Sequence, residues 1–267
     1  MSKLRRARLK QRLDPVAFDS IATETDELLE RRLRKAKRLT DVASPDVNLN
    51  PFLMLALAPA YNIASPFEAA EYVQLSKMLH GDSTAFGRYV EDKILPVFGV
   101  RPVAEKKRSP KLYSPIDAEV SVEGKRYLMT LKAGPWTMNQ SHANEMVNRF
   151  PEIHDKTGDD IVIGIFYGSR SRLNNKPRLV EVNTGDYVTT LVGKDFWEFV
   201  TGVKDAHQEI FRAIREAQSR FAARHGGETF YEQMIEARLA LSRSIREAFG
   251  LGAEDIDMWE QLFEGAF

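Results

Sequence analysis

Short apolar segments between residues 112 and 190 predict a β-sheet. Ile116–Val122 alternates apolar and polar residues, which is the pattern of a strand with one buried face. Glu123-Gly124 follows as a hairpin-type turn, and Tyr127–Leu131 is a second strand. Asp160–Tyr167 is almost continuously apolar, which is typical of a strand buried on both faces. The two patterns together indicate a mixed sheet.

Two further segments complete this region. Arg178–Val182 predicts a fourth strand. Gln140–Phe150 has a helix-forming composition and is followed by Pro151, so we expect a helix that ends there and crosses from the second strand to the third. Helices on a mixed central sheet give an α/β fold.

The residues before the sheet predict helices. Apolar residues at nearly helical spacing, without Gly or Pro, predict an amphipathic helix over Ile21–Leu39. Prolines divide the next stretch, so we expect Phe52–Leu57 to be a buried turn or short helix. Ser65-Pro66 predicts the start of a helix that ends at Gly81, and an apolar stripe over Phe86–Val97 predicts another.

Helical composition returns after Gly193, in segments separated by paired glycines. The predicted C-terminal helices are Val203–Arg224, Glu228–Phe249 and Ala253–Phe263. The expected organisation is an N-terminal helical region (1–80), a sheet-containing core (81–192) and a C-terminal helical region packed on the core (193–267).

The composition narrows the class of protein. A chain of 267 residues with 43% hydrophobic residues can form a sizeable core, which excludes disorder and a coiled-coil rod. Without cysteine, any metal must be held by oxygen atoms or by the five histidines. No apolar run approaches the roughly 20 residues of a membrane helix, and no apolar signal core follows the basic N-terminus. We therefore expect a cytoplasmic protein without a membrane partner.

The charge is balanced in total but uneven along the chain. The 38 basic residues equal the 38 acidic ones, yet residues 1–38 carry twelve Lys/Arg and only six Asp/Glu. Part of this excess forms a cluster at Arg31, Arg32, Arg34 and Lys35. The cluster is either the solvated face of a helix or an arm that contacts DNA phosphates.

Candidate chemistry lies at the ends of the first two predicted strands, at Asp117 and Lys132. A carboxylate that binds Mg²⁺ and a lysine that stabilises hydroxide or the charge on phosphorus are what metal-assisted phosphodiester hydrolysis needs. Because side chains on a strand repeat every second residue, Thr130 and Lys132 share one face. In a purely structural interpretation, Asp117 caps a turn and Lys132 faces water.

This segment resembles the PD-(D/E)XK nuclease superfamily. Pro115-Ile116-Asp117 matches its Pro-Asp element with one residue inserted, and Thr130-Leu131-Lys132 matches its acidic-x-Lys tripeptide. The stretch Ala133–Asn139 resembles the Lys-small-Gly-Pro-x-x-x-Asn sequence of certain type II restriction endonucleases. Phe86–Glu91 is similar to the first core helix of such enzymes, which places an acidic residue near the metal. The resemblance covers about residues 82–185 and implies a restriction-endonuclease-like α/β fold.

Thr130 departs from the pattern, because it stands where the family usually has Asp or Glu. A neutral hydroxyl is a poorer Mg²⁺ ligand than a carboxylate, so another acid must compensate. Glu91 on the preceding helix is the favoured candidate, although it could instead pair with Arg88 or Lys93, and Glu119 is the second. If neither acid is in place, the protein binds DNA without cutting it.

Several polar residues near these strands have the chemistry of DNA contacts. Basic side chains bind phosphates, and arginine and amide side chains recognise base edges. The loop that contains Lys106, Lys107 and Arg108 is equally compatible with a structural interpretation, in which its basic side chains are only solvated. The candidates are Lys106, Lys107, Arg108, Asn139, Gln140, Arg170 and Arg172.

The resemblance implies a type II restriction endonuclease, a Mg²⁺-dependent hydrolase of double-stranded DNA. A homodimer is expected, because a palindromic site presents two equivalent strands. Asp117 and Glu91 would bind the metal beside Thr130, the carbonyl of Leu131 would complete the coordination, and Lys132 would orient or activate the nucleophile. The alternatives are a non-cleaving DNA-binding protein on a degenerate nuclease scaffold, and a helical interaction protein with an incidental sheet.

Overall fold

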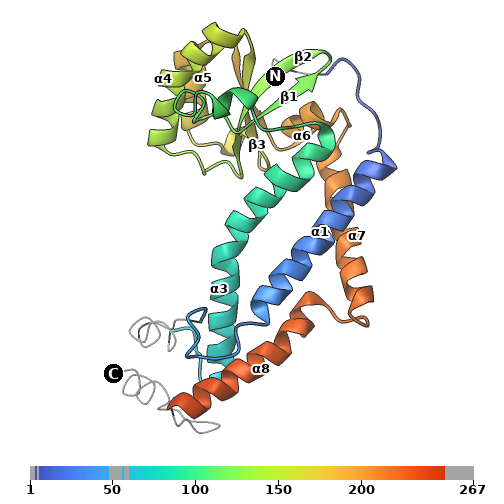
Figure 1. The fold of residues 1–267 in the computed structure, drawn as a ribbon, viewed down its shortest axis with the longest axis vertical. Helices are drawn as coiled ribbons and strands as arrows, with labels where there is room; N and C mark the ends of the chain where they lie inside the picture. Colours follow the sequence, from blue (N-terminus) through green and yellow to red (C-terminus); the bar gives the residue numbers. More distant parts are fainter. Residues whose placement is uncertain (1–3, 5, 48–55, 57–59, 250–267) are drawn as a thin grey trace. The chain divides into compact units, whose positions relative to one another are not determined.

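The computed structural model describes residues 4, 6–47, 56 and 60–249. They belong to two compact units, one formed by the segments up to Glu24 and Gly87–Arg215, the other by Thr25–Phe86 and the chain from Glu216 onward (Figure 1). The predicted helix Ala253–Phe263, and Phe52–Leu57 apart from residue 56, lie outside the described residues. Within the described part, no helix has the length and apolar character needed to cross a membrane.

The first unit is built on the predicted mixed sheet. The strand order is β1 (Ala118–Val122), β2 (Lys125–Lys132), β3 (Asp160–Ile165) and β4 (Val188–Val192). β1 is antiparallel to β2, whereas β3 and β4 run parallel to it. The predicted turn joins β1 and β2 at Glu123 and Gly124, whose φ angles are 51° and 80°. These positive angles fit a two-residue hairpin turn.

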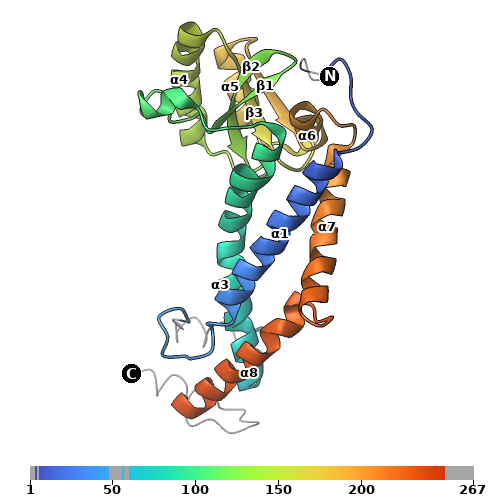
Figure 2. The same cartoon turned by 45° about the vertical axis from the view of Figure 1, so that its right-hand side comes forward.

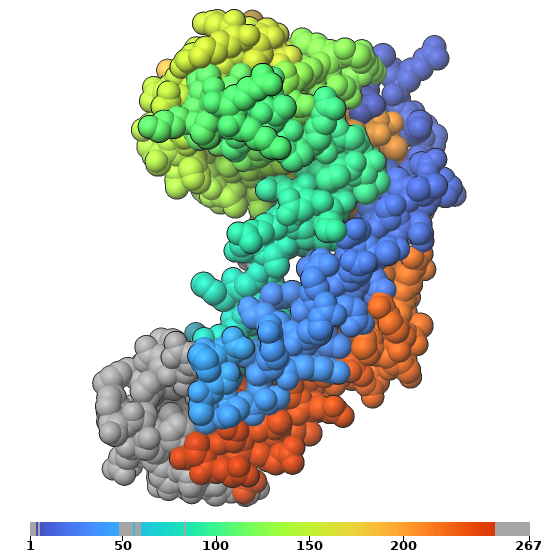
Figure 3. Space-filling view, viewed as in Figure 1, coloured from blue at the N-terminus to red at the C-terminus, as the bar shows by residue number. Residues whose placement is uncertain are grey.

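Helices cover both faces of this sheet (Figure 2). On one face, α4 (Gln140–Thr157) and α5 (Lys176–Thr184) bury Phe150 and Val180 in one cluster with Leu128 and Ile163 of the strands. On the other, α6 (Lys194–Thr201) packs Phe196 so closely on Gly164 that a Cβ there would collide with its ring. In the space-filling view, the green and yellow part of the chain, which includes β1 to β3, forms a closely packed surface (Figure 3).

Two predicted elements in this unit are wrong. Arg178–Val182 is not a strand but lies in α5, with Pro177 in its first turn, where the fixed φ of proline suits a helix. Its Val180 is buried and Val182 is 73% exposed, so a five-residue alternation could not distinguish the two structures. α4 does not end at Pro151 either, and continues to Thr157, because buried residues on both sides of the proline hold the helix in place.

The second unit is helical. It contains α8 (Phe230–Phe249) together with the parts of α1 (Pro15–Ala36), α3 (Pro66–Tyr89) and α7 (Ala206–Arg224) that fall within its bounds. The predicted helix start at Ser65-Pro66 is confirmed. The Glu68 amide donates to Ser65 Oγ over 3.2 Å, and Glu68 Oε2 accepts from the Ala64 amide over 2.7 Å. This reciprocal arrangement satisfies amide groups at the helix end.

Gly81 does not end α3 as predicted. The helix continues through it, and a Cβ at this position would lie 3.1 Å from Lys35 Nζ and 3.4 Å from the Arg32 guanidinium. Arg32 donates to the Met78 carbonyl over 2.8 Å and pairs with Asp82. The glycine therefore provides room for basic side chains of α1 instead of a helix terminus.

Candidate active site

Asp117 and Lys132 lie at the same edge of the sheet. Asp117 directly precedes β1 and Lys132 is the last residue of β2, and the two strands are antiparallel neighbours. The Asp117 amide donates to the Met129 carbonyl over 2.8 Å. Its carboxylate oxygen Oδ2 accepts from the Leu131 amide over 2.7 Å and from Thr130 Oγ1 over 3.3 Å. Within the described residues Oδ1 accepts no hydrogen bond, so one oxygen is fixed and the other is open.

Thr130 is fully buried, and its hydroxyl is directed at Asp117. It therefore supports the carboxylate in this structure. The carbonyl of Met129 accepts the hydrogen bond from the Asp117 amide, so it points toward β1. Backbone groups of alternate residues in a strand face the same side, and the Leu131 carbonyl therefore also points to the side of β2 on which Asp117 lies. Sequence reasoning missed the Leu131 amide as the main support of Asp117, since a backbone donor leaves no signal in the residue types.

Glu91 reaches this region from a π-helical turn, Val90–Ile94, that continues α3. The Leu95 amide bonds to the Val90 carbonyl, and Val90 and Ile94 are buried. Such turns add a residue to the helix and often occur at functional sites. The pKa of Glu91 is raised, first by desolvation and then by repulsion from Asp117, while Lys132 lowers it. The Glu91 carboxylate therefore lies within electrostatic range of both Asp117 and Lys132.

Lys132 is partly buried, and in the described part of the chain its ammonium group has no ion-pair or hydrogen-bond partner. The structural interpretation of Glu91 holds in part, because Arg88 attracts its carboxylate electrostatically without an ion pair among the described residues. Lys93 does not pair with Glu91 but with Glu24, over 3.1 Å. Asp117 binds the adjacent strand rather than a turn of its own. The arrangement leaves two carboxylates and one ammonium group available for a ligand.

Glu119, the second acid considered as compensation for Thr130, is not available to a metal. It is 5% exposed and its carboxylate binds Arg101 over 2.6 Å and Arg126 over 2.5 Å. Both guanidinium groups already neutralise its charge. Among the described residues no group of three or more His, Asp or Glu side chains gathers as a metal site.

The proposed DNA contacts fall into two groups, and the side chains of the first are held inside the unit. Lys106 Nζ donates to the Ile116 carbonyl over 2.6 Å and to that of Ser114 over 3.4 Å. Asn139 Oδ1 accepts from the His142 amide over 2.9 Å and thereby caps α4. The Lys106 ammonium group and Asn139 Oδ1 therefore already have partners within the fold.

Gln140 and Arg170 are held in the same way. Gln140 binds Lys176 over 2.6 Å. Arg170 donates to the Thr190 carbonyl over 2.9 Å and pairs with Glu181 over 3.0 Å. The second group, Lys107, Arg108 and Arg172, is exposed and has no side-chain partner among the described residues.

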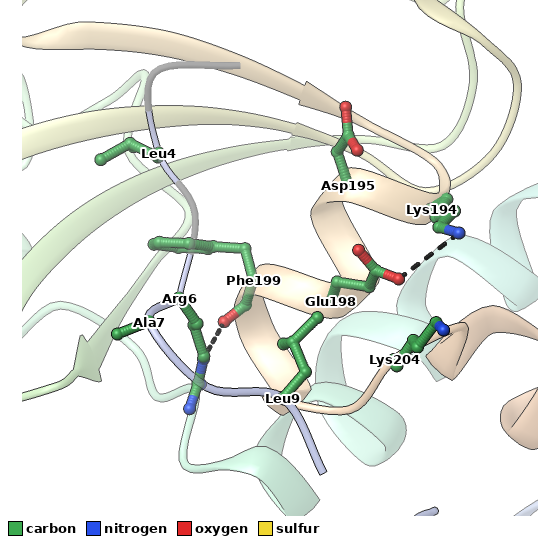
Figure 4. A pocket seen from close by; sticks show the side chains of 9 residues that line it. All are labelled: Leu4, Arg6, Ala7, Leu9, Lys194, Asp195, Glu198, Phe199 and Lys204. Atoms are coloured by element: carbon green, nitrogen blue, oxygen red, sulfur yellow. Dashed lines mark hydrogen bonds and ion pairs between the residues drawn. The ribbon is translucent and has the colours of Figure 1, made fainter. Parts of the chain in front are cut away.

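A cavity of about 460 Å³ in this unit is lined by other residues. Its walls come from the N-terminal segment, from α6 and from Lys204 (Figure 4). Arg6 donates to the carbonyls of Phe199 and Val200, each over 2.7 Å, at the end of α6, and desolvation lowers its pKa. These contacts attach the N-terminal segment to α6. None of the candidate site residues lines the cavity.

The α/β unit has a mixed sheet with a fixed carboxylate at one edge, a lysine without a partner among the described residues, and an acid from the preceding helix, which is the arrangement that the resemblance to the PD-(D/E)XK nucleases implies. The comparison with protein families is more specific. The family model described as Type II restriction endonuclease EcoO109I matches residues 19–221, which include Glu91, Asp117 and Lys132. The chain belongs to this family of site-specific deoxyribonucleases. No curated protein matches the chain.

Proposed function

We propose that this protein hydrolyses phosphodiester bonds at a specific double-stranded DNA sequence and requires Mg²⁺. One observation carries the proposal. The partly buried ammonium group of Lys132, which has no partner among the described residues, and the open carboxylate oxygen of Asp117 lie at one edge of the sheet and act electrostatically on Glu91. Unpaired charges gathered in this way are uncommon where a residue serves only the fold.

The residues present fit a magnesium ion. Asp117 and Glu91 would bind it, with the Leu131 carbonyl as a third oxygen and Thr130 beside it in support. Mg²⁺ commonly takes one or two protein carboxylates and completes its shell with water and substrate phosphate. A cation would also relieve the repulsion by which Asp117 raises the pKa of Glu91. When bound, the ion supplies Lewis-acid stabilisation of the charge that develops on the phosphate.

The protein's own residues then have distinct tasks. The Leu131 amide and the Thr130 hydroxyl hold Asp117 in one orientation. Lys132 orients the attacking water and stabilises the negative charge of the transition state with its ammonium group. Lys107, Arg108 and Arg172, whose cationic groups have no partner in the described part of the chain, would bind phosphates. A homodimer would bring one site to each strand of a palindromic sequence.

The test is the cleavage of plasmid DNA by the purified protein with and without Mg²⁺. Discrete fragments with Mg²⁺ support a sequence-specific endonuclease. Lys132→Ala should remove cleavage and leave DNA binding within a few-fold, because the lost ammonium group acts mainly in the transition state. Lys125→Ala is the matched control, since Lys125 is on the same strand and its ammonium group contacts only groups away from the site, in a surface ion pair with Asp160 and over the Tyr127 ring, among the described residues. Equal cleavage by wild type and Lys132→Ala would refute the assignment.

Thr130 favours a second candidate, a DNA-binding protein that does not cut. Its neutral hydroxyl leaves the site with one carboxylate fewer than the family pattern. If the wild-type protein binds DNA but never cleaves it, this candidate is correct. Cleavage gained by Thr130→Glu would then show that the missing acid was the cause.

A further inference from the structure

Two loops follow the strands of the candidate site and are attached to each other. Residues 133–139 follow β2, and residues 166–175 follow β3. Asn174 Nδ2 donates to the Met138 carbonyl over 2.8 Å, and its amide donates to the Pro135 carbonyl over 3.3 Å. The ring of Tyr167 covers Gly134 so closely that a Cβ there would collide with it. The two loops therefore form one fixed surface directly beyond Lys132.

Trp136 occupies the tip of this surface. Its backbone is part of a turn in which the Thr137 amide and hydroxyl donate to the Gly134 carbonyl over 3.3 and 2.8 Å. Pro135 stands at the position of the turn where proline is favoured. The indole is nevertheless 73% exposed, and it has no ring contact or hydrogen bond with any residue that the structure describes. The fold holds the backbone of Trp136 in place without using its side chain.

The rest of the surface is aromatic and cationic. Tyr167 is 59% exposed, and Arg172 is exposed with its guanidinium group free among the described residues. Neither loop contains an Asp or Glu residue. An exposed aromatic surface with a free cation and no acid is complementary to DNA, which offers phosphates together with flat bases and apolar sugars.

We propose that Trp136, Tyr167 and Arg172 form a DNA-contact surface beside Lys132. The indole of Trp136 packs against a base or sugar close to the cleaved bond, and Arg172 pairs with a nearby phosphate. By contrast, Asn139 Oδ1, the Gln140 side chain and the Arg170 guanidinium group have partners within the fold. The inference rests on the proposed function, because it takes the DNA at Lys132 as the substrate.

The experiment measures binding to a duplex that carries the mapped cut site, with Ca²⁺ in place of Mg²⁺ so that the DNA stays intact. Trp136→Ala should weaken binding about 5- to 100-fold, as expected for the loss of aromatic packing on nucleic acid. Its salt dependence should not change, because no charge is lost. Trp136→Phe should retain most of the affinity. Phe211→Ala is the matched control, since Phe211 is an exposed aromatic residue of the same unit, on α7, and should bind as wild type does.

Fluorescence provides a second measurement that does not depend on the alanine variant folding. The chain has three tryptophans, and Trp197 is buried with its indole nitrogen bonded to the Phe166 carbonyl. DNA should quench the emission of the wild-type protein, and Trp136→Phe should lose most of this quenching. Unchanged quenching in Trp136→Phe would contradict the proposal.

Two other results would overturn the inference. One is binding by Trp136→Ala within twofold of wild type. The other is a change in the molar mass of Trp136→Ala in light scattering, which would assign the surface to contact between copies of the chain. If the wild-type protein cleaves DNA and Trp136→Ala binds DNA normally, only the contact surface is rejected. Absence of wild-type cleavage rejects the proposed function, and the binding assay still decides the role of Trp136.

Discussion

Replacement of Lys106 with methionine should slow DNA cleavage without weakening the contact with DNA phosphates. Lys106 Nζ is bonded to the carbonyls of Ile116 and Ser114, just before Asp117 in the chain. Methionine retains much of the aliphatic stem and removes the ammonium group. The backbone before Asp117 then loses the ammonium group that holds it in place. The orientation in which Asp117 offers its open oxygen to the metal is therefore fixed less firmly.

The magnitude follows from these two hydrogen bonds. Removal of a hydrogen bond to a charged group costs about 1.5–3 kcal/mol. The contact to Ile116 is short at 2.6 Å, the one to Ser114 is long at 3.4 Å, and the side chain is partly exposed. We therefore expect the activation free energy of cleavage to rise by about 1–2 kcal/mol if the whole loss affects the orientation of Asp117. This rise corresponds to a roughly 5- to 30-fold slower reaction.

The assay compares Lys106→Met with Lys107→Met. Lys107 lies in the same short helical turn, Ala104–Lys107, is exposed and has no partner among the described residues. Cleavage rates at increasing Mg²⁺ and the salt dependence of DNA binding are measured for both. Lys107→Met should cleave at nearly the wild-type rate and lose about one unit of salt slope. Wild-type cleavage by Lys106→Met together with that loss of slope would show that Lys106 is a phosphate contact and would refute the reasoning.

Three further predictions concern the site and its support. Lowering the pH through the raised pKa of Glu91 should weaken Mg²⁺ binding, because the protonated carboxyl group is a poor ligand. Asp117→Asn should lower the pKa of Glu91, because it removes a repelling charge, and an NMR titration would detect this shift. Thr130→Val should reduce the free energy of unfolding by about 1 kcal/mol through loss of its hydrogen bond to Asp117, and an unchanged urea midpoint would contradict this. Arg126→Met should lower the free energy of unfolding, measured in urea, by about 2–3 kcal/mol, since it leaves the buried Glu119 with one partner. A second change, Glu119→Gln, should recover part of this loss.

The sequence was most informative where its signals are local. The hairpin around Glu123-Gly124 and the helix start at Ser65-Pro66 were predicted correctly, because each depends on residues only a few positions apart. The candidate site depends on the same hairpin, which explains why Asp117 and Lys132 could be placed at one edge. The helix α5 was mistaken for a strand because its short alternating segment fits both structures.

The properties that could not be predicted depend on partners distant in the chain. Arg170 has the chemistry of a base-reading residue, yet Thr190 and Glu181 occupy its guanidinium group. Glu119 is two residues from Asp117 and is nevertheless neutralised by arginines. The exposure of Trp136 likewise depends on how two loops meet, so neither the residue type nor the spacing could reveal it.

The two-residue turn at Glu123 and Gly124 has a consequence for the chemistry at the opposite end of the hairpin. β1 spans five residues, so the turn lies roughly 17 Å from Asp117. It fixes the pairing of Val122 with Lys125 and thereby brings Asp117 opposite Thr130. An inserted or deleted residue in the turn that shifts this pairing by one would direct Asp117 to the other face of the sheet and away from Lys132. The length of a surface turn that touches no substrate is therefore a condition for catalysis.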